Sequence, residues 1–154
     1  MAQTEQETVL RLTRRYNATP EQVFDAWTSA ELLRKWWGPQ PNFENAGADV
    51  DLRPGGRYRL SMTDKQSGAT HTVSGEYTEV SRPDRLAYTW QWEGDDDSMA
   101  GSEETRIVVE FNQDGDGTEV VLTHSGFTNS EVRDMHSMGW SGCLASLERA
   151  IFPS

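Results

Sequence analysis

The three histidines are the side chains of this sequence best suited to acid–base chemistry. His124 falls on the apolar face of a predicted strand, where a buried imidazole must be hydrogen-bonded, and it could orient a ligand or relay a proton near neutral pH. The alternative is a core histidine bonded to a backbone carbonyl or to a hydroxyl on the final helix. His136 is expected to be exposed near the start of that helix or bonded locally, and His71 to be a surface residue of a strand.

The cysteine and the acidic residues do not predict a metal site. Cys143 is the only cysteine, so it cannot form an internal disulfide, and it has too few nearby co-ligands for structural zinc. Without an identifiable basic neighbour to favour a thiolate, it is expected to pack as a small apolar group. Asn112, Asp114 and Asp116 match the start of a calcium loop, but Thr123 occupies the glutamate position and strands flank the segment. We predict a hairpin turn there, and no metal or cofactor.

Known catalytic motifs do not occur in the sequence. It has no glycine-rich phosphate loop, no serine-nucleophile elbow and no paired metal-ligand spacing. One enzymatic hypothesis stays open, namely a cyclase or hydrolase that uses His124 as acid or base, with Tyr77, Tyr88 or a bound water passing protons. Whether the protein is an enzyme is therefore undecided from the sequence, and non-enzymatic ligand binding is favoured.

Charge and hydropathy exclude several classes of partner. The formal net charge is −11, from 14 basic and 25 acidic side chains, which disfavours both nucleic acid and anionic membrane surfaces. The acidic stretch over residues 93–104 is expected to be a solvated loop. No apolar run approaches the ~20 residues that span a bilayer, and no leader-like segment is found. We expect a cytoplasmic protein without membrane insertion, forming one domain over residues 1–154.

The N-terminal third combines one strand with two short helices. Residues 1–7 are polar and expected to be frayed, and residues 8–16 alternate as a half-buried strand. Thr19 and Gln22 form a capping-box pattern around a helix that starts at Pro20. Ser29 is positioned to cap a second short helix that ends at Trp36.

From about residue 47 the apolar period becomes two, and turn residues recur at hairpin spacing. This pattern predicts six antiparallel strands near residues 47–52, 56–63, 70–80, 84–92, 103–113 and 117–125. A long helix follows, capped by Asn129 or Ser130 and running to about Ile151. Its apolar arc is wider than one stripe, so it should be covered on more than one side. The fold class is therefore α+β, with the order β-α-α-β6-α.

Alternation along the strands assigns their two faces. The concave face is expected to carry Tyr58, Leu60, Met62, Val73, Tyr77, Leu86, Tyr88, Trp90, Ile107, Val109, Phe111, Val120, Leu122 and His124. The opposite face is mostly polar and is expected to meet water; it carries Arg57, Arg59, Arg85, Gln91, Arg106, Glu110, Glu119 and Thr123.

This order of elements resembles the helix-grip fold of the START and polyketide-cyclase (SRPBCC) superfamily, a curved antiparallel sheet around a long C-terminal helix. Local motifs resemble the family named for homology to the activator of heat-shock protein 90 ATPase. They are TPEQVFDAW over 19–27, WWGP over 36–39, GGRY over 55–58, GEY over 75–77, Arg85-Leu86, Thr89-Trp90, LTHSGF over 122–127, and His136 with Gly139-Trp140. The resemblance implies a cavity between sheet and helix more firmly than any one activity. A chaperone partner is not expected, because the chain has only the one domain.

Apolar walls with a few polar tips are what a ligand pocket needs. We expect a small hydrophobic or aromatic molecule to bind against Trp37, Tyr58, Leu60, Met62, Val73, Tyr77, Tyr88, Trp90, Val109, Leu122, His124, Met135, Gly139, Trp140 and Cys143. The alternative is that these residues simply fill a core. Trp36, Trp37 and Trp140 could close the pocket mouth or fix the short helices to the long one. A third hypothesis is an interaction module, either co-chaperone-like or a homodimer that presents Trp92 or other outward apolar groups.

Overall fold

The computed structural model describes residues 9–38, 43–93, 104–127 and 130–153. The predictions for residues 1–7, for the acidic stretch 94–103 and for Asn129 lie outside the described residues. The elements, in chain order, are β1 (Val9–Tyr16), α1 (Pro20–Thr28), α2 (Ala30–Trp36), β2 (Phe43–Val50), β3 (Arg57–Asp64), β4 (Thr70–Ser81), β5 (Arg85–Trp92), β6 (Thr105–Asp114), β7 (Gly117–Ser125) and α3 (Ser130–Ala150).

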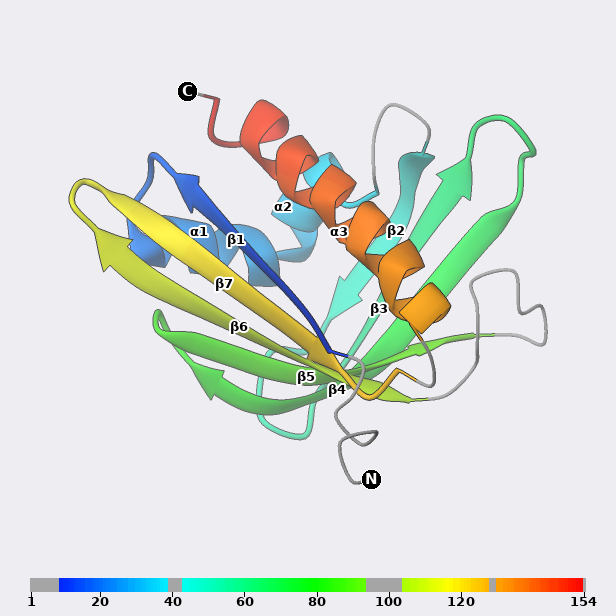
Figure 1. The fold of residues 1–154 in the computed structure, drawn as a ribbon, viewed down its shortest axis with the longest axis horizontal. Coiled ribbons are helices and arrows are strands. Elements are labelled where there is room, and N and C mark those ends of the chain that lie inside the picture. The colour runs from blue at the N-terminus through cyan, green and yellow to red at the C-terminus, as the bar shows by residue number, and fades with distance from the viewer. Residues whose placement is uncertain (1–8, 39–42, 94–103, 128–129, 154) are drawn as a thin grey trace.

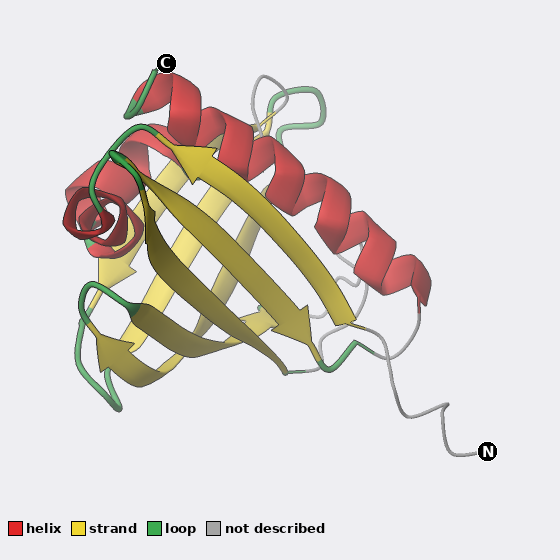
Figure 2. Ribbon diagram, turned by 60° about the vertical axis from the view of Figure 1, so that its left-hand side comes forward, coloured by secondary structure: helices red, strands yellow, loops and turns green. Residues whose placement is uncertain are grey.

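The strands form one antiparallel sheet in the order β1-β7-β6-β5-β4-β3-β2. The sheet is strongly curved, and α3 crosses its open side (Figure 1). The short helices α1 and α2 cover one end of the sheet beside the C-terminal half of α3 (Figure 2). This arrangement confirms the predicted α+β helix-grip fold. Within the described ranges, none of the helices combines the length and apolar character needed to cross a membrane.

The helix starts follow from local capping. Thr19 accepts a hydrogen bond from the Gln22 backbone while the Gln22 side chain accepts from the Thr19 backbone, which completes the predicted capping box. Ser29 ends α1 and also caps α2 by accepting from the Leu32 backbone. The two helices therefore meet at a single residue, which fixes the angle at which α2 leads its tryptophans toward α3.

The second strand is the element whose start was predicted wrongly. β2 begins at Phe43 rather than near residue 47. A β-bulge between Asn45 and Gly47 shifts the register against β3, so the alternation is broken in the middle of the strand. Burial alternates on both sides of the bulge, but its phase shifts by one residue there, from odd-numbered to even-numbered inward positions.

The core lies between the concave face of the sheet and α3. All fourteen residues assigned to the concave face are buried, so the predicted inward register is confirmed. Polar contacts join the helices to this core: Tyr16 on β1 donates to the Leu144 carbonyl, and Ser146 on α3 donates to the Trp36 carbonyl. Trp36 itself donates to the Ala26 carbonyl, so it connects α1, α2 and α3.

Gly75 on β4 makes room for an aromatic ring. A Cβ atom built there would lie 2.0 Å from the Thr89 carbonyl oxygen and 2.8 Å from a ring carbon of Tyr58. Without that atom, the Tyr58 phenol crosses β4 and donates to the same carbonyl. Glycine at this position therefore lets one tyrosine connect three neighbouring strands.

Replacing Gly75 with alanine is expected to lower the free energy of unfolding by about 1–3 kcal/mol, because the added methyl overpacks a rigid sheet. Urea unfolding measures this change. Glu76→Ala, an exposed change at the next residue, is the control and should stay within about 0.5 kcal/mol of the parent. Equal stability of Gly75→Ala and the parent would contradict the close packing of Tyr58 over β4.

Candidate functional site

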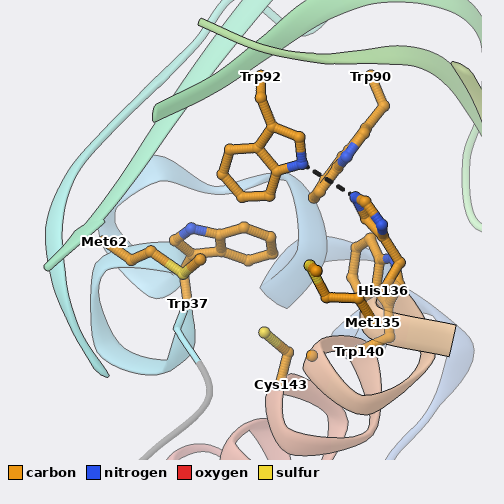
Figure 3. A pocket seen from close by; sticks show the side chains of 9 residues that line it. Trp37, Met62, Trp90, Trp92, Met135, His136, Trp140 and Cys143 are labelled. Atoms are coloured by element: carbon orange, nitrogen blue, oxygen red, sulfur yellow. Dashed lines mark hydrogen bonds between the residues drawn. The ribbon is translucent and has the colours of Figure 1, made fainter. Parts of the chain in front are cut away.

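An apolar hollow lies between α3 and the sheet (Figure 3). It is lined by Trp37 from the end of α2, Met62 from β3, Trp90 and Trp92 from β5, and Met135, His136, Gly139, Trp140 and Cys143 from α3. The space between atoms is about 380 Å³, part of which is open to solvent. Only about 40 Å³ of this space can be reached by the centre of a sphere the size of a water molecule. Because one water needs roughly 10–15 Å³ by this measure, the hollow holds about three water molecules as it stands.

The fifteen residues predicted to bind ligand separate into three groups. Seven line this hollow: Trp37, Met62, Trp90, Met135, Gly139, Trp140 and Cys143. Four line a second space of about 310 Å³ on the other side of Trp37: Tyr58, Leu60, Tyr77 and Tyr88. The last four line neither space and are buried in the core: Val73, Val109, Leu122 and His124.

Indole rings form most of the wall of the hollow. Trp37 packs edge-to-face against Trp90 and Trp140, with ring centroids 5.8 and 5.7 Å apart. Trp90 and Trp140 lie 5.1 Å apart. Trp37 and Trp140 line the hollow, whereas Trp36 is fully buried and joins the helices. Such aromatic pairs give a rigid wall, since their geometry is favoured beyond simple area burial.

Trp92 and His136 line the hollow but were not predicted to do so. Trp92 is buried and donates from Nε1 to Nε2 of His136 at 2.9 Å (Figure 3). The expectation that Trp92 faces outward to form a dimer is therefore wrong. Trp92 has the same parity as Trp90, so continuing the alternation of β5 by one step would have placed it inside.

His136 was expected to be exposed or bonded locally. It does contact its own helix, at 2.9 Å from Nδ1 to the Val132 carbonyl, but it is also buried against Trp92. Its spacing of four residues from Trp140 and seven from Cys143 places it on one helical face with them, which is the signal that could have found it. Because Nε2 accepts from the indole, the network assigns the ring proton to Nδ1.

His124 is a core histidine with both ring nitrogens engaged. Nδ1 accepts from Nε1 of Trp140 at 3.1 Å, and Nε2 lies 2.7 Å from Oγ1 of Thr105. Thr105 in turn donates to the Trp90 carbonyl. The hydroxyl partner is thus on β6, and the prediction of a hydroxyl on the final helix is wrong. The same logic assigns the proton of His124 to Nε2, so its basic lone pair is already occupied.

Both histidines are held neutral by their surroundings. Burial lowers the pKa of His124 well below its usual value, and the neighbouring His136 lowers it further. Burial also lowers the pKa of His136, which the Val132 carbonyl partly offsets. The two rings lie 5.4 Å apart, so protonating one would disfavour protonating the other. Each imidazole accepts a hydrogen bond from an indole through one ring nitrogen and donates one through the other.

The remaining polar groups near the hollow have little nucleophilic character. Burial raises the pKa of the Cys143 thiol to about 12, so it stays protonated. In the neighbouring space, Tyr88 accepts a hydrogen bond from Trp27, and burial raises the pKa of its phenol. Among the described residues, no group of three or more histidine, cysteine or acidic side chains is arranged to hold a metal ion.

The neutral histidine pair predicts how stability depends on pH. In the unfolded chain each imidazole titrates near about 6.5, whereas in the folded protein both pKa values are lower. Their contribution to stability is therefore complete above that pH and is lost progressively as the pH falls below it. Each histidine can add a slope of at most about 1.4 kcal/mol per pH unit, the value for a difference of one bound proton.

Chemical unfolding between pH 7 and 5 measures this slope. His136→Gln keeps one donor and one acceptor without titrating, so the slope should fall, by at most about 1.4 kcal/mol per pH unit. His71→Gln removes the histidine that lies outside this cluster and serves as the control. An unchanged slope in His136→Gln would show that the imidazole is not held neutral.

Similar proteins of known structure share this architecture. A protein from Chromobacterium violaceum is 23% identical with a TM-score of 0.83, covering 96% of this chain and 100% of its own. An AHSA1 protein from Silicibacter pomeroyi is 28% identical with a TM-score of 0.79, covering 92% and 96%. A protein from Plasmodium falciparum described as an HSP90 activator is 24% identical with a TM-score of 0.71, covering 96% and 99%. No curated protein matches the sequence.

The family assignment comes from the sequence match. Residues 17–151 match the family described as Activator of Hsp90 ATPase homolog 1-like protein. The match runs from the residue after β1 through the last turn of α3, so it includes every residue that lines the hollow. The chain therefore belongs to the Activator of Hsp90 ATPase homolog 1-like family.

Proposed function

We propose that this protein binds a small hydrophobic or aromatic molecule in the hollow between α3 and the sheet. The observation that carries this proposal is the lining itself: four indoles, two methionines and no charged side chain surround a space that opens to solvent. Apolar walls of this kind supply affinity for an apolar guest because its surface leaves water.

Size limits the guest. Space for about three waters is too small for a large ligand, so the guest is one or two rings that displace flexible side chains at the rim. Met62 and Met135 are suited to this, because the unbranched thioether adopts many rotamers at low cost. Met135 is 42% exposed, so it can turn outward without breaking the core.

The other functions considered have less support. Catalysis by His124 requires a free lone pair near the substrate, but His124 does not line the hollow and its Nδ1 is occupied. An interaction module that presents Trp92 is not supported, because Trp92 is buried. The similarity to the P. falciparum HSP90 activator, at 24% identity, concerns the fold. No specific feature of the hollow favours either alternative.

Gly139 provides a direct test because it lines the hollow and a Cβ atom built there meets nothing within 4 Å. Gly139→Leu should fill the space and weaken the binding of benzene and naphthalene at least tenfold. Titrations followed by ¹H–¹⁵N NMR measure the two affinities. The matched control Gly139→Ala should change affinity less than twofold. It should also stabilise the protein by about 0.5–1 kcal/mol, because alanine favours the helix.

Two outcomes would contradict the proposal. Benzene and naphthalene could fail to bind the parent at millimolar concentration, or they could bind Gly139→Leu as tightly as the parent. Far-ultraviolet circular dichroism and urea unfolding of both variants establish that α3 is intact, so that a loss of binding reports on the filled space alone.

A further inference from the structure

The side chains that line the hollow differ from those of the core around it. Four are indoles, and three carry sulfur: Met62 from β3, and Met135 and Cys143 from α3. Of the described residues, no leucine, isoleucine or valine lines the hollow. Figure 3 shows the three sulfur atoms around the space beside the Trp37 ring. The wall therefore consists mainly of polarisable groups that come from both layers of the fold.

The neighbouring space shows that this composition is local. Leu33, Leu60 and Leu86 contribute to the lining of that second space. β3 supplies Leu60 to the second space and Met62 to the hollow, and β5 likewise supplies Leu86 to the former and Trp90 to the latter. The change from aliphatic to polarisable side chains thus occurs within single strands. Filling the interior does not require such a change, because aliphatic side chains pack apolar space well.

The indoles of the wall meet one another edge-to-face. The ring planes of Trp90 and Trp92 are 87° apart with centroids at 5.4 Å, and those of Trp37 and Trp140 are 71° apart at 5.7 Å. Aromatic pairs favour this geometry because the positive edge of one ring meets the negative face of another. A flat aromatic guest extends this arrangement with its own edges and faces, whereas a saturated guest has no such charge distribution to offer.

Sulfur adds a second preference for aromatic rings. A thioether sulfur makes favourable contacts with an aromatic ring at about 5 Å, often at the ring edge. Met62 belongs to the sheet and Met135 to α3, so sulfur reaches a ring held between the two layers from both of them. Both side chains can move to admit the ring and then pack against it, because unbranched thioethers change rotamer at low cost.

Polar substituents do not fit inside the hollow. Its surface is almost wholly apolar, and both ring nitrogens of His136 are already bonded, to Trp92 and to the Val132 carbonyl. A hydroxyl or carboxylate there would lose its hydrogen bonds to water without replacing them. Met135 is exposed and marks a side of the hollow that meets solvent, so a polar part of the guest would remain there.

We propose that the hollow selects an unsubstituted aromatic ring over an aliphatic group of similar size, and that Met62 and Met135 set this preference through sulfur contacts with the ring. This inference rests on the proposed binding function and narrows its guest to an aryl group. Any polar part of the guest lies outside the hollow, beside Met135. The two methionines are thus specificity determinants as well as flexible side chains at the rim.

An aliphatic chain is the principal competing guest. The free energy gained by leaving water depends on the apolar area that is buried, so burial alone does not separate a chain from a ring of similar area. The contacts with sulfur and with indole edges favour the ring. A substitution that removes sulfur and keeps the shape of the side chain tests this difference directly.

Norleucine provides that substitution, because it has a methylene group where methionine has sulfur. Protein in which norleucine replaces the methionines should bind benzene at least about threefold less tightly than the parent, the combined effect of two sulfur–aromatic contacts. Cyclohexane has the same ring size without the π system, and its affinity should change by less than about twofold. Titrations followed by ¹H–¹⁵N NMR measure all four affinities.

Single variants locate the effect. Met62→Leu and Met135→Leu should each weaken benzene binding about two- to tenfold and change cyclohexane binding by less than about twofold. Met138→Leu is the matched control, because Met138 lies on the same helix as Met135, is 77% exposed and does not line the hollow; it should bind both compounds as the parent does. If a leucine variant fails to fold, the norleucine protein decides.

The outcomes distinguish this inference from the function on which it rests. Unchanged benzene affinity in the norleucine protein would overturn the sulfur assignment and leave apolar binding intact. An equal loss for benzene and cyclohexane would also overturn it, because the methionines would then act through their shape alone. If neither compound bound the parent, both proposals would fail.

Discussion

The structure depends on how a single long helix covers a strongly curved sheet. α3 makes its main backbone contacts with β1 and α2, at one edge and one end of the sheet, and crosses the middle strands at a greater distance. Large side chains must fill the space between, because a protein interior tolerates few voids. Indoles do most of this filling, and each brings one N–H group that needs an acceptor once it is buried. Filling the space with indoles therefore requires hydrogen-bond acceptors between the helix and the sheet.

The two histidines supply acceptors for two of the four indoles that line the hollow. His124 on β7 accepts from Trp140 on α3, and His136 on α3 accepts from Trp92 on β5, so the two bonds cross the interface in opposite directions. Both imidazoles must stay neutral to do so. Residues that suggest catalysis in the sequence thus hold the helix in position over the sheet, and fold and function have to be argued separately at this site.

Local and periodic features could be predicted from the sequence, whereas contacts between distant segments could not. Alternation placed Tyr58, Trp90 and Val109 on the inner face, and the Thr19 capping box fixed the start of α1. The bulge in β2 defeated the same alternation. The partner of His124 is a hydroxyl nineteen residues earlier on the neighbouring strand β6, which depends on register and not on spacing. Whether fifteen apolar residues enclose one space or two depends on where Trp37 lies, and no periodic pattern contains that information.

The close indole rings of the aromatic wall also bear on the fluorescence of the protein. Every tryptophan has another indole within 6.1 Å, centroid to centroid, in a continuous series: Trp27, Trp36, Trp37, Trp90, Trp92 and Trp140. At such separations the rings exchange excitation energy and couple their transition dipoles. Excitation energy absorbed by one of the six indoles can therefore pass to its neighbours along the series, from α1 to the hollow. A quencher beside one ring therefore also lowers the emission of its neighbours, and near-ultraviolet circular dichroism reports the mutual orientation of the rings as well as the environment of each.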